Sequence, residues 1–254
     1  MRILVLVKQV PDTWGDRHLD PASGRIDRRD PEPVIDEIAE RAVEVALRYR
    51  DGADAEVVVL TMGPESATDM LRRVLAMGAD SAVQVVDPTL EGADMMTTAA
   101  VLAAAIRRTG FDVVVAGNES SDGRGGVLAA MVAEHLGVPH LARLDEVVID
   151  EEHVRGVRVV GSERVSLRAA VPAILSVTER APEARLAGFK GIMQAKKKPL
   201  ERYGLADLAP NLPAARSVVI AVTQAPARTA GTTIVDSGDA AVQLADFLTS
   251  QRLV

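Results

Sequence analysis

The sequence contains no cysteine, and this absence removes several kinds of chemistry at once. Disulfides, thiolate nucleophiles and cysteine-bound metals or clusters are excluded. A chain without cysteine fits a reducing compartment, so we expect a cytoplasmic protein.

Long hydrophobic runs are also missing. The apolar run near the start, Ile3–Val7, is short and is followed at once by Lys8. A secretion signal needs an apolar stretch of about 7–15 residues, and a membrane span needs about 18 or more. We therefore expect a soluble protein.

Aromatic residues make up only 2% of the chain, and the net charge is −7. The acidic balance argues against nucleic acid as a partner, and the few aromatic rings argue against a platform on which bases stack. Aromatic side chains are also too scarce for a self-contained flavin pocket. If a flavin is involved, we expect a partner chain to hold most of it.

Short β-branched runs alternate with stretches of helical period in the first half of the chain. We expect strands at Ile3–Val7, Glu56–Met62, Ser81–Val86 and Val113–Ala116. We expect helices at Asp36–Arg50, Pro64–Met77, Asp94–Arg108 and Gly125–Leu136. Three details are predicted within these helices: a capping box of Ser66 and Asp69, an inward face of Met96, Ala99, Ala103 and Ile106, and a stop at Gly137. The alternation predicts an α/β fold, with a mostly parallel sheet covered by helices on both faces.

Two regions depart from this rhythm. The stretch His18–Glu32 is rich in Pro, Asp and Arg and predicts a long surface excursion. In the second half we expect short strands at Leu144–Ile149, His153–Val160, Glu163–Leu167 and Ala173–Val177. We divide the chain into an α/β domain, residues 1–181, and an extended C-terminal arm, residues 182–254, with a last helix at Ala240–Gln251. An arm of this kind buries little within its own chain and therefore suggests a partner.

A glycine-rich segment, Gly117–Gly126, follows the fourth expected strand and precedes a helix. Ligands bind at the carboxyl ends of strands in open parallel sheets, and glycines let backbone amides approach a phosphate. One interpretation is a phosphate cradle, and the other is a turn whose glycines only satisfy the backbone. The segment matches neither the Walker A loop nor G-x-G-x-x-G. Glu119 and Asp122 oppose a phosphate unless they face a sugar or base, and Arg124 could offset them.

A second segment, Arg185–Lys198, combines apolar residues with three consecutive lysines. Phe189, Ile192 and Met193 lie in a stretch without a packing period, made flexible by glycines. They form either a docking anchor on a mobile loop or a loop folded back on the core. The acidic net charge favours a solvated charge run over a nucleic-acid patch for the lysines.

Catalytic patterns are missing from the sequence. The histidines have no recognised metal spacing, and Ser120 and Ser121 lack the G-x-S-x-G elbow. We therefore expect no metal site and a chain that is not an enzyme.

Several motifs resemble the β subunit of electron transfer flavoproteins, in the form found in actinobacteria, over essentially the whole length. These motifs are Val7–Thr13, Asp36–Val43, Leu75–Asp80, Ala116–Glu119, Asp122-Gly123, Phe189–Lys198 and Arg228–Gly231. The resemblance implies a Rossmann-like nucleotide-binding fold, similar to that of the adenine nucleotide alpha hydrolases. It also implies a heterodimer in which the α subunit carries the redox-active FAD at the interface, while this chain binds a structural AMP. It implies an electron carrier that accepts electrons from flavin dehydrogenases, including the acyl-CoA dehydrogenases of fatty-acid oxidation, and passes them to a membrane quinone reductase.

The resemblance also implies two sets of site residues. The AMP contacts are Leu6, Pro33, Val34, Ile35, Asp36, Met62, Gly117, Asn118, Glu119, Ser120, Ser121, Asp122, Gly123, Arg124, Gly125, Gly126, Val127 and Leu128. The recognition loop that docks the dehydrogenase is Arg185, Leu186, Ala187, Gly188, Phe189, Lys190, Gly191, Ile192, Met193 and Gln194, with Phe189 as the anchor.

The chain departs from the family pattern at a few of these positions. Many members have Asn-Pro-Phe in place of Pro33-Val34-Ile35, Asp in place of Ser120 and Ser121, Gln in place of Arg124, and Leu in place of Phe189. Two alternatives stay open. One is a stand-alone adenine-nucleotide-binding module, such as a stress protein, and the other is a bifurcating variant that binds a second FAD in the AMP site.

Overall fold

The computed structural model describes residues 1–14, 18–28, 33–208, 212, 219–223, 225–226 and 231–254. Parts of the expected excursion His18–Glu32 and of the motif Arg228–Gly231 lie outside these residues. The chain divides into two units, Met1–Ala221 and Val222–Val254, and each is described by itself.

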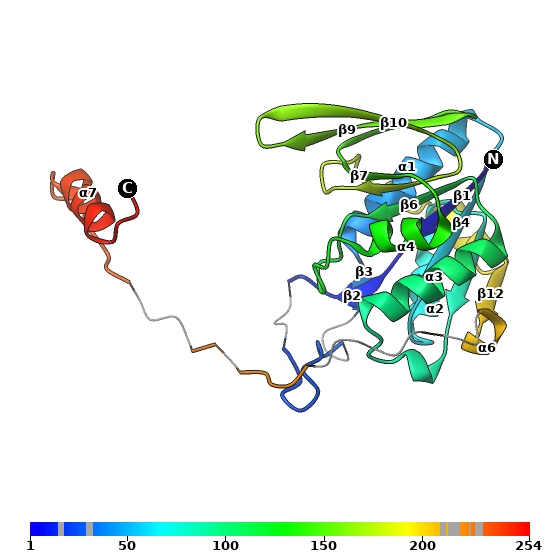
Figure 1. Cartoon of the computed structure of the whole chain (residues 1–254), viewed down its shortest axis with the longest axis horizontal. Coiled ribbons are helices and arrows are strands. Elements are labelled where there is room, and N and C mark those ends of the chain that lie inside the picture. The colour runs from blue at the N-terminus through cyan, green and yellow to red at the C-terminus, as the bar shows by residue number, and fades with distance from the viewer. Residues whose placement is uncertain (15–17, 29–32, 209–211, 213–218, 224, 227–230) are drawn as a thin grey trace. The chain divides into compact units, whose positions relative to one another are not determined.

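Within the described part of the first unit, seven strands form one parallel sheet in the order β12-β5-β4-β1-β6-β11-β7 (Figure 1). Their bounds are β1 Arg2–Leu6, β4 Glu56–Met62, β5 Ser81–Val85, β6 Val113–Gly117, β7 His140–Leu144, β11 Ala173–Val177 and β12 Leu200–Tyr203. The chain adds β4 and β5 on one side of β1 and then crosses to place β6 on the other side. Strand order therefore reverses between β1 and β6, which is where open α/β sheets bind ligands.

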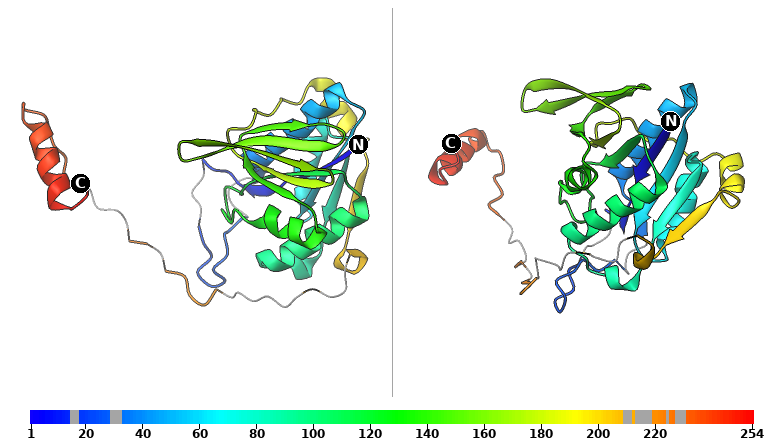
Figure 2. Two further views of the ribbon diagram at one scale, coloured as in Figure 1. Left: turned by 45° about the horizontal axis from the view of Figure 1, so that its top comes forward. Right: turned by 45° about the vertical axis from the view of Figure 1, so that its right-hand side comes forward.

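Helices cover both faces of this sheet (Figure 2). The helices are α1 Glu37–Gly52, α2 Ala67–Met77, α3 Met95–Thr109, α4 Leu128–Leu136, α5 Phe189–Ala195 and α6 Leu205–Leu208, with a short 3₁₀ turn at Pro88–Leu90. Alternate residues of β1 point to opposite faces, so Ile3 and Val5 pack with α1 and α2, while Leu4 packs with α3 and α4. The predicted α/β fold with helices on both faces is confirmed.

Some local predictions inside the helices were wrong. Ser66 has a helical backbone and makes no capping bond to α2; its hydroxyl donates instead to Oε1 of Gln9 at 3.2 Å. Met96 lies in the first turn of α3 and is 39% exposed, whereas Ala99, Ala103 and Ile106 are buried as predicted. The helix expected from Gly125 begins only at Leu128, because Gly126 has a left-handed backbone (φ 68°).

Antiparallel strands form two small additions to the main sheet. The expected strand Leu144–Ile149 is divided between β7 and β8 (Glu146–Ile149), and β8 pairs with β9 (His153–Val160), which pairs with β10 (Glu163–Ala170). Nearer the start of the chain, β2 (Gln9–Pro11) pairs with β3 (Pro33–Ile35). This pairing brings the two ends of the surface excursion together.

The stretch after Ala181 is more ordered than its sequence pattern predicted. It supplies α5, then β12, which pairs with β5 at an edge of the main sheet, and then α6. The boundary between the two units thus falls at Ala221, later than the expected boundary at Ala181. The second unit contains helix α7 (Ala240–Ser250), close to the predicted last helix. In the described part of the chain, no helix has both the length and the apolar character that a membrane span requires.

Candidate functional site

The predicted nucleotide residues from separate parts of the sequence meet at the carboxyl ends of three adjacent strands. Leu6, the last residue of β1, pairs with Leu60 of β4 on one side and Ala116 of β6 on the other. Met62 and Gly117 end those two neighbouring strands and are half-buried. The site thus lies at the point where the strand order reverses.

Asp36 joins the start of α1 to the glycine-rich loop. Its carboxylate is buried, and one oxygen accepts from the amides of Ile38 and Ala39 at 3.1 and 3.3 Å, which caps the helix. The other oxygen accepts from the amide of Ser121 at 2.6 Å. A single side chain therefore sets the position of the loop against α1. Pro33–Ile35, as β3, lead directly into this residue.

The loop from Asn118 to Val127 is held by hydrogen bonds at its start and is exposed to solvent at its end. The Asn118 amide donates to the Val177 carbonyl at 2.8 Å, yet its buried Oδ1 has no hydrogen-bond partner among the described residues. Arg124 and Gly126 take left-handed backbone angles, φ 48° and 68°. Leu128 then begins α4 without a side-chain cap from the described residues, so the first amides of this helix face outward with partial positive charge.

Two cations that the sequence analysis missed lie at this loop. Lys8 donates to Oγ of Ser120 at 3.0 Å and to Asp122 at 2.7 Å, and Arg28 makes a second ion pair with Asp122 at 2.7 Å. Burial alone would raise the pKa of Asp122, but the charges and hydrogen bonds of Lys8, Ser120 and Arg28 hold it well below its usual range. Of the two acidic residues expected to oppose a phosphate, Glu119 and Asp122, the second is therefore already paired with cations.

Lys8 follows β1 and could have been found by its position after a strand, as the Gly117–Gly126 segment was. Arg28 comes from the long excursion, where no spacing points to Asp122. The remaining loop residues from Gly123 to Val127 are exposed.

Room for a ligand at Gly125 is limited by one flexible side chain. A Cβ added there would lie 2.6 Å from Sδ of Met95, the first residue of α3. The other close approach is at Gly117, where a Cβ would lie 3.1 Å from Cγ2 of Ile38. Gly117 therefore has a packing role against α1, while Gly125 faces only a side-chain end that can move.

A separate polar hollow of about 160 Å³ lies beside the ends of β7 and β11, and no residue of the glycine-rich loop lines it. Asp145 accepts there from the hydroxyl of Thr178 and from the amide of Val159. Arg180 lies 3.8 Å from the same carboxylate. These groups satisfy one another and join the β8-β9-β10 sheet to the main sheet.

The predicted recognition loop is partly a helix. Residues from Phe189 onward form α5, and a Cβ at Gly191 would overlap the Ala76 carbonyl oxygen, so this glycine allows α5 to lie directly on α2. We expected a flexible loop because the sequence has no helical periodicity, and this was wrong. The helix is held by its close packing on α2. Three outward side chains of α5, together with Leu186 three residues before it, form an apolar surface, here called the docking face. Its members are Leu186, Phe189, Ile192 and Met193, exposed by 94%, 82%, 49% and 56%.

The three lysines after α5 differ in role. Lys196 and Lys197 are exposed, but Nζ of Lys198 donates to the carbonyls of Leu75, Gly78 and Ala79 at 2.9, 3.2 and 2.6 Å. Burial lowers the pKa of Lys198. It caps the end of α2, so the interpretation of all three lysines as one solvated charge run was wrong.

The sheet order, with its reversal between β1 and β6, defines a doubly wound α/β protein whose loops gather at the carboxyl edge of the sheet. Comparison with known proteins is more specific. Residues 23–208 match the family described as the electron transfer flavoprotein domain. The chain is 42% identical over 263 residues to the electron transfer flavoprotein subunit β of Mycobacterium tuberculosis and to that of Mycobacterium leprae, covering 99% of each chain. It is 32% identical over 210 residues to the subunit CarD of the caffeyl-CoA reductase–Etf complex of Acetobacterium woodii, covering 82% of this chain and 80% of that one. The chain belongs to the β-subunit branch of the electron transfer flavoprotein family.

Proposed function

We propose that this chain is the β subunit of a cytoplasmic heterodimeric electron carrier that holds a structural AMP and docks flavin dehydrogenases. The similarity to mycobacterial β subunits along nearly the whole chain carries this proposal. The α subunit would hold the FAD, which supplies the capacity to accept and release electrons. The chain itself would act by binding and positioning, as a carrier subunit and not as an enzyme.

The residues at the reversal point of the sheet fit an adenine nucleotide. The outward amides at the start of α4 and the glycines before it suit a phosphate, and Lys8 lies at the same loop beside Ser120. The unpartnered Oδ1 of Asn118 is a buried acceptor, which an adenine amino group or a ribose hydroxyl would satisfy. Leu6 and Met62 supply apolar surface beside these groups.

The docking face fits the second part of the proposal. Phe189, Ile192 and Met193 are spaced to lie on one side of α5, and an exposed apolar cluster of this kind marks a protein-interaction site. We assign it to an acyl-CoA dehydrogenase or another flavin dehydrogenase, from which electrons would pass to a quinone reductase. The second unit, whose α7 exposes Val242, Leu244 and Phe247, would pack on the α subunit.

The stand-alone nucleotide-binding module and the bifurcating carrier with a second FAD remain as alternatives. The first is favoured if the chain forms no complex with an α subunit. The second is favoured if the complex contains two FAD and no AMP.

The docking role is tested by Phe189→Ala in the heterodimer. Truncating a central apolar anchor costs about 2–4 kcal/mol of binding, or about 30- to 1000-fold in affinity. Electron transfer from a reduced acyl-CoA dehydrogenase should therefore slow at low carrier concentration and approach the normal rate at saturation. Since Phe189 is 82% exposed, flavin content and melting temperature should not change.

Val148→Ala is the matched control, because Val148 is an exposed apolar residue of β8, outside the docking face. It should transfer electrons normally. If Phe189→Ala also transfers at the normal rate under sub-saturating conditions, the dehydrogenase docks elsewhere.

A further inference from the structure

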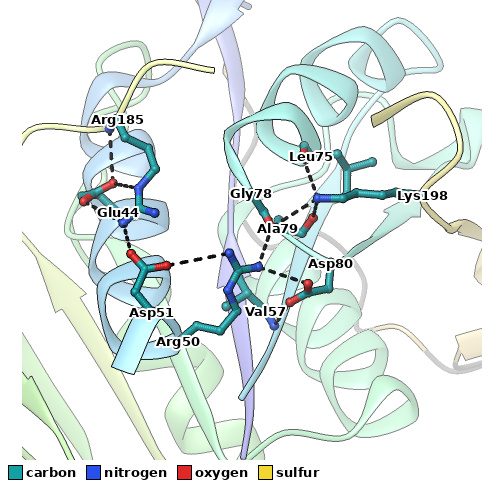
Figure 3. A network of polar contacts seen from close by, with 10 residues as sticks. All are labelled: Glu44, Arg50, Asp51, Val57, Leu75, Gly78, Ala79, Asp80, Arg185 and Lys198. Atoms are coloured by element: carbon teal, nitrogen blue, oxygen red, sulfur yellow. Dashed lines mark hydrogen bonds and ion pairs between the residues drawn. The ribbon is translucent and has the colours of Figure 1, made fainter. Parts of the chain in front are cut away.

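The segment before α5 is tied to α1 by one arginine. Arg185 lies three residues before Gly188, which directly precedes α5, and is part of the predicted recognition loop. Its amide, Nε and Nη2 donate to the carboxylate of Glu44 at 3.2, 2.8 and 3.2 Å, and Nη2 also donates to Asp51 at 2.8 Å (Figure 3). Glu44 and Asp51 are two helical turns apart, so one guanidinium spans one side of α1.

The Glu44 side chain is 5% exposed, which is unusual for a carboxylate. Burial would raise the pKa of Glu44, but hydrogen bonds from Arg185 and Arg48 lower it below its ordinary value. A buried carboxylate held by a forked guanidinium is geometrically specific, because both partners must keep their orientation. The pair therefore fixes the path of the chain at Arg185.

The other end of the segment is fixed separately. Nη1 of Arg72 donates to the carbonyls of Ala195 and Lys198 at 2.7 and 2.8 Å, and Lys198 is bound to the end of α2. The Gly78 carbonyl accepts from both Lys198 and Arg50, and Arg50 in turn lies 4.0 Å from Asp51 (Figure 3). The two anchoring points thus belong to one polar network, beside the docking face but not part of it.

We propose that Arg185, with Glu44 and Asp51, is a positioning clamp that holds the docking face in the conformation that a dehydrogenase binds. The inference rests on the proposed docking function. Leu186 and Phe189 are too exposed to be held by their own packing, so the backbone must be held by the clamp on one side and by α2 on the other. Without the clamp, the docking face adopts the conformation that binds the dehydrogenase for only part of the time. The apparent affinity for the dehydrogenase then equals the full affinity multiplied by the fraction of time spent in that conformation.

The test uses the complete heterodimer and measures electron transfer from a reduced acyl-CoA dehydrogenase over a range of carrier concentrations. Arg185→Met should raise the apparent KM about 5- to 10-fold, corresponding to a competent fraction of about a fifth to a tenth, and leave kcat unchanged. Arg185→Lys should give an intermediate value, since lysine keeps the charge but not the fork. Glu44→Gln/Arg185→Met should match Arg185→Met, because both changes remove the same contact.

Arg48→Met is the matched control. Arg48 donates to the same carboxylate at 2.9 Å but lies on α1 and holds no part of the docking segment. Its KM should equal that of the unmodified protein. Hydrogen exchange supplies a second readout: Arg185→Met should exchange faster in residues 183–190 and unchanged in residues 196–203, where Arg72 and Lys198 still hold the chain.

The outcomes separate the clamp from the docking proposal. A normal KM for Arg185→Met, while Phe189→Ala raises it, would overturn the clamp and leave the docking face intact. An equal rise in KM for Arg48→Met and Arg185→Met would also overturn it, since the effect would then belong to α1. A normal KM for Phe189→Ala would overturn the docking proposal and the clamp together.

Discussion

Asp122 stabilises the loop through charge, and its effect depends on pH. The side chain is fully buried, whereas its partners Lys8 and Arg28 are 42% and 48% exposed. Folding lowers the pKa of this carboxyl from its ordinary 3.8. The ionised form therefore contributes stability at every pH above 3.8, and this contribution is lost as the pH falls below 3.8 towards the lowered value.

Asp122→Asn should lower the free energy of unfolding at pH 7 by about 1–3 kcal/mol, because charge-assisted hydrogen bonds are lost. Chemical denaturation should show the same loss in free energy of unfolding at pH 5 and a smaller loss below pH 3.8. Glu91→Gln is the control, since Glu91 is 84% exposed in its pair with Arg25, and it should change stability by less than about 0.5 kcal/mol. If the loss of stability in Asp122→Asn is as large below pH 3.8 as at pH 7, the side chain stabilises the loop by its packing and not by its charge.

A substitution at Gly125 tests the proposed nucleotide site. Gly125→Val should reduce the AMP content of the purified heterodimer, because a side chain there would fill the space that a phosphate needs. The melting temperature should fall with it, since a ligand bound only to the folded state stabilises that state. Nucleotide extraction and quantification measure the first effect and calorimetry the second.

Met95→Ala separates two reasons for this glycine. The valine would collide first with Sδ of Met95, so Met95→Ala/Gly125→Val removes that collision. If the ligand requires the glycine, AMP stays low in the double variant. Restored AMP would mean that Gly125 serves only the packing of α3.

Of the candidate site residues, Gly117 was predicted from its place at the end of a strand, whereas Leu6 and Asp36 came from the family resemblance. A parallel sheet brings such positions to one edge whatever their separation in the chain. The role of Asp36 in holding Ser121 was not predictable, since it depends on how closely α1 approaches the loop. The ion pair of Arg28 with Asp122 could not be predicted, because Arg28 lies in the excursion His18–Glu32, whose sequence has neither helical nor strand periodicity.

At the scale of elements, the strongest strands were predicted well. Glu56–Met62, His153–Val160 and Ala173–Val177 have the bounds that their β-branched runs indicate. α5 and β12 were missed for a physical reason. Glycine lowers helix propensity, so the sequence of α5 argues against a helix, and only the contact of Gly191 with Ala76 explains its presence. β12 is a short edge strand, and the polar residues Glu201 and Arg202 lie on its exposed part.

Lys198 joins two elements, because it lies just before β12 and its side chain binds the end of α2. Lys198→Met should lower the free energy of unfolding by about 1–3 kcal/mol, since the carbonyls of Leu75 and Ala79 lose the lysine donor and that of Gly78 keeps only Arg50. Lys197→Met, at an exposed neighbour, should change it by less than about 0.5 kcal/mol. Chemical denaturation of the two variants compares them directly. Equal stabilities would mean that Lys198 is a surface lysine like the others.

At the scale of the whole molecule, the first unit carries both the proposed nucleotide site and the proposed docking face. The site lies at the carboxyl edge of the sheet, and the docking face lies on α5, which packs against α2. The second unit contributes no buried residue from α7 within the described part of the chain. The account therefore predicts that the first unit supplies the binding surfaces, that the second unit packs on a partner, and that function needs two subunits.

The most direct measurement is the cofactor content of the chain alone and of its complex with an α subunit. Both are purified, their absorbance spectra are recorded, and their nucleotides are extracted and quantified. The account predicts a colourless chain without FAD, and a yellow heterodimer with one FAD and one AMP. One FAD bound to the isolated chain, or a heterodimer with two FAD and no AMP, would contradict it.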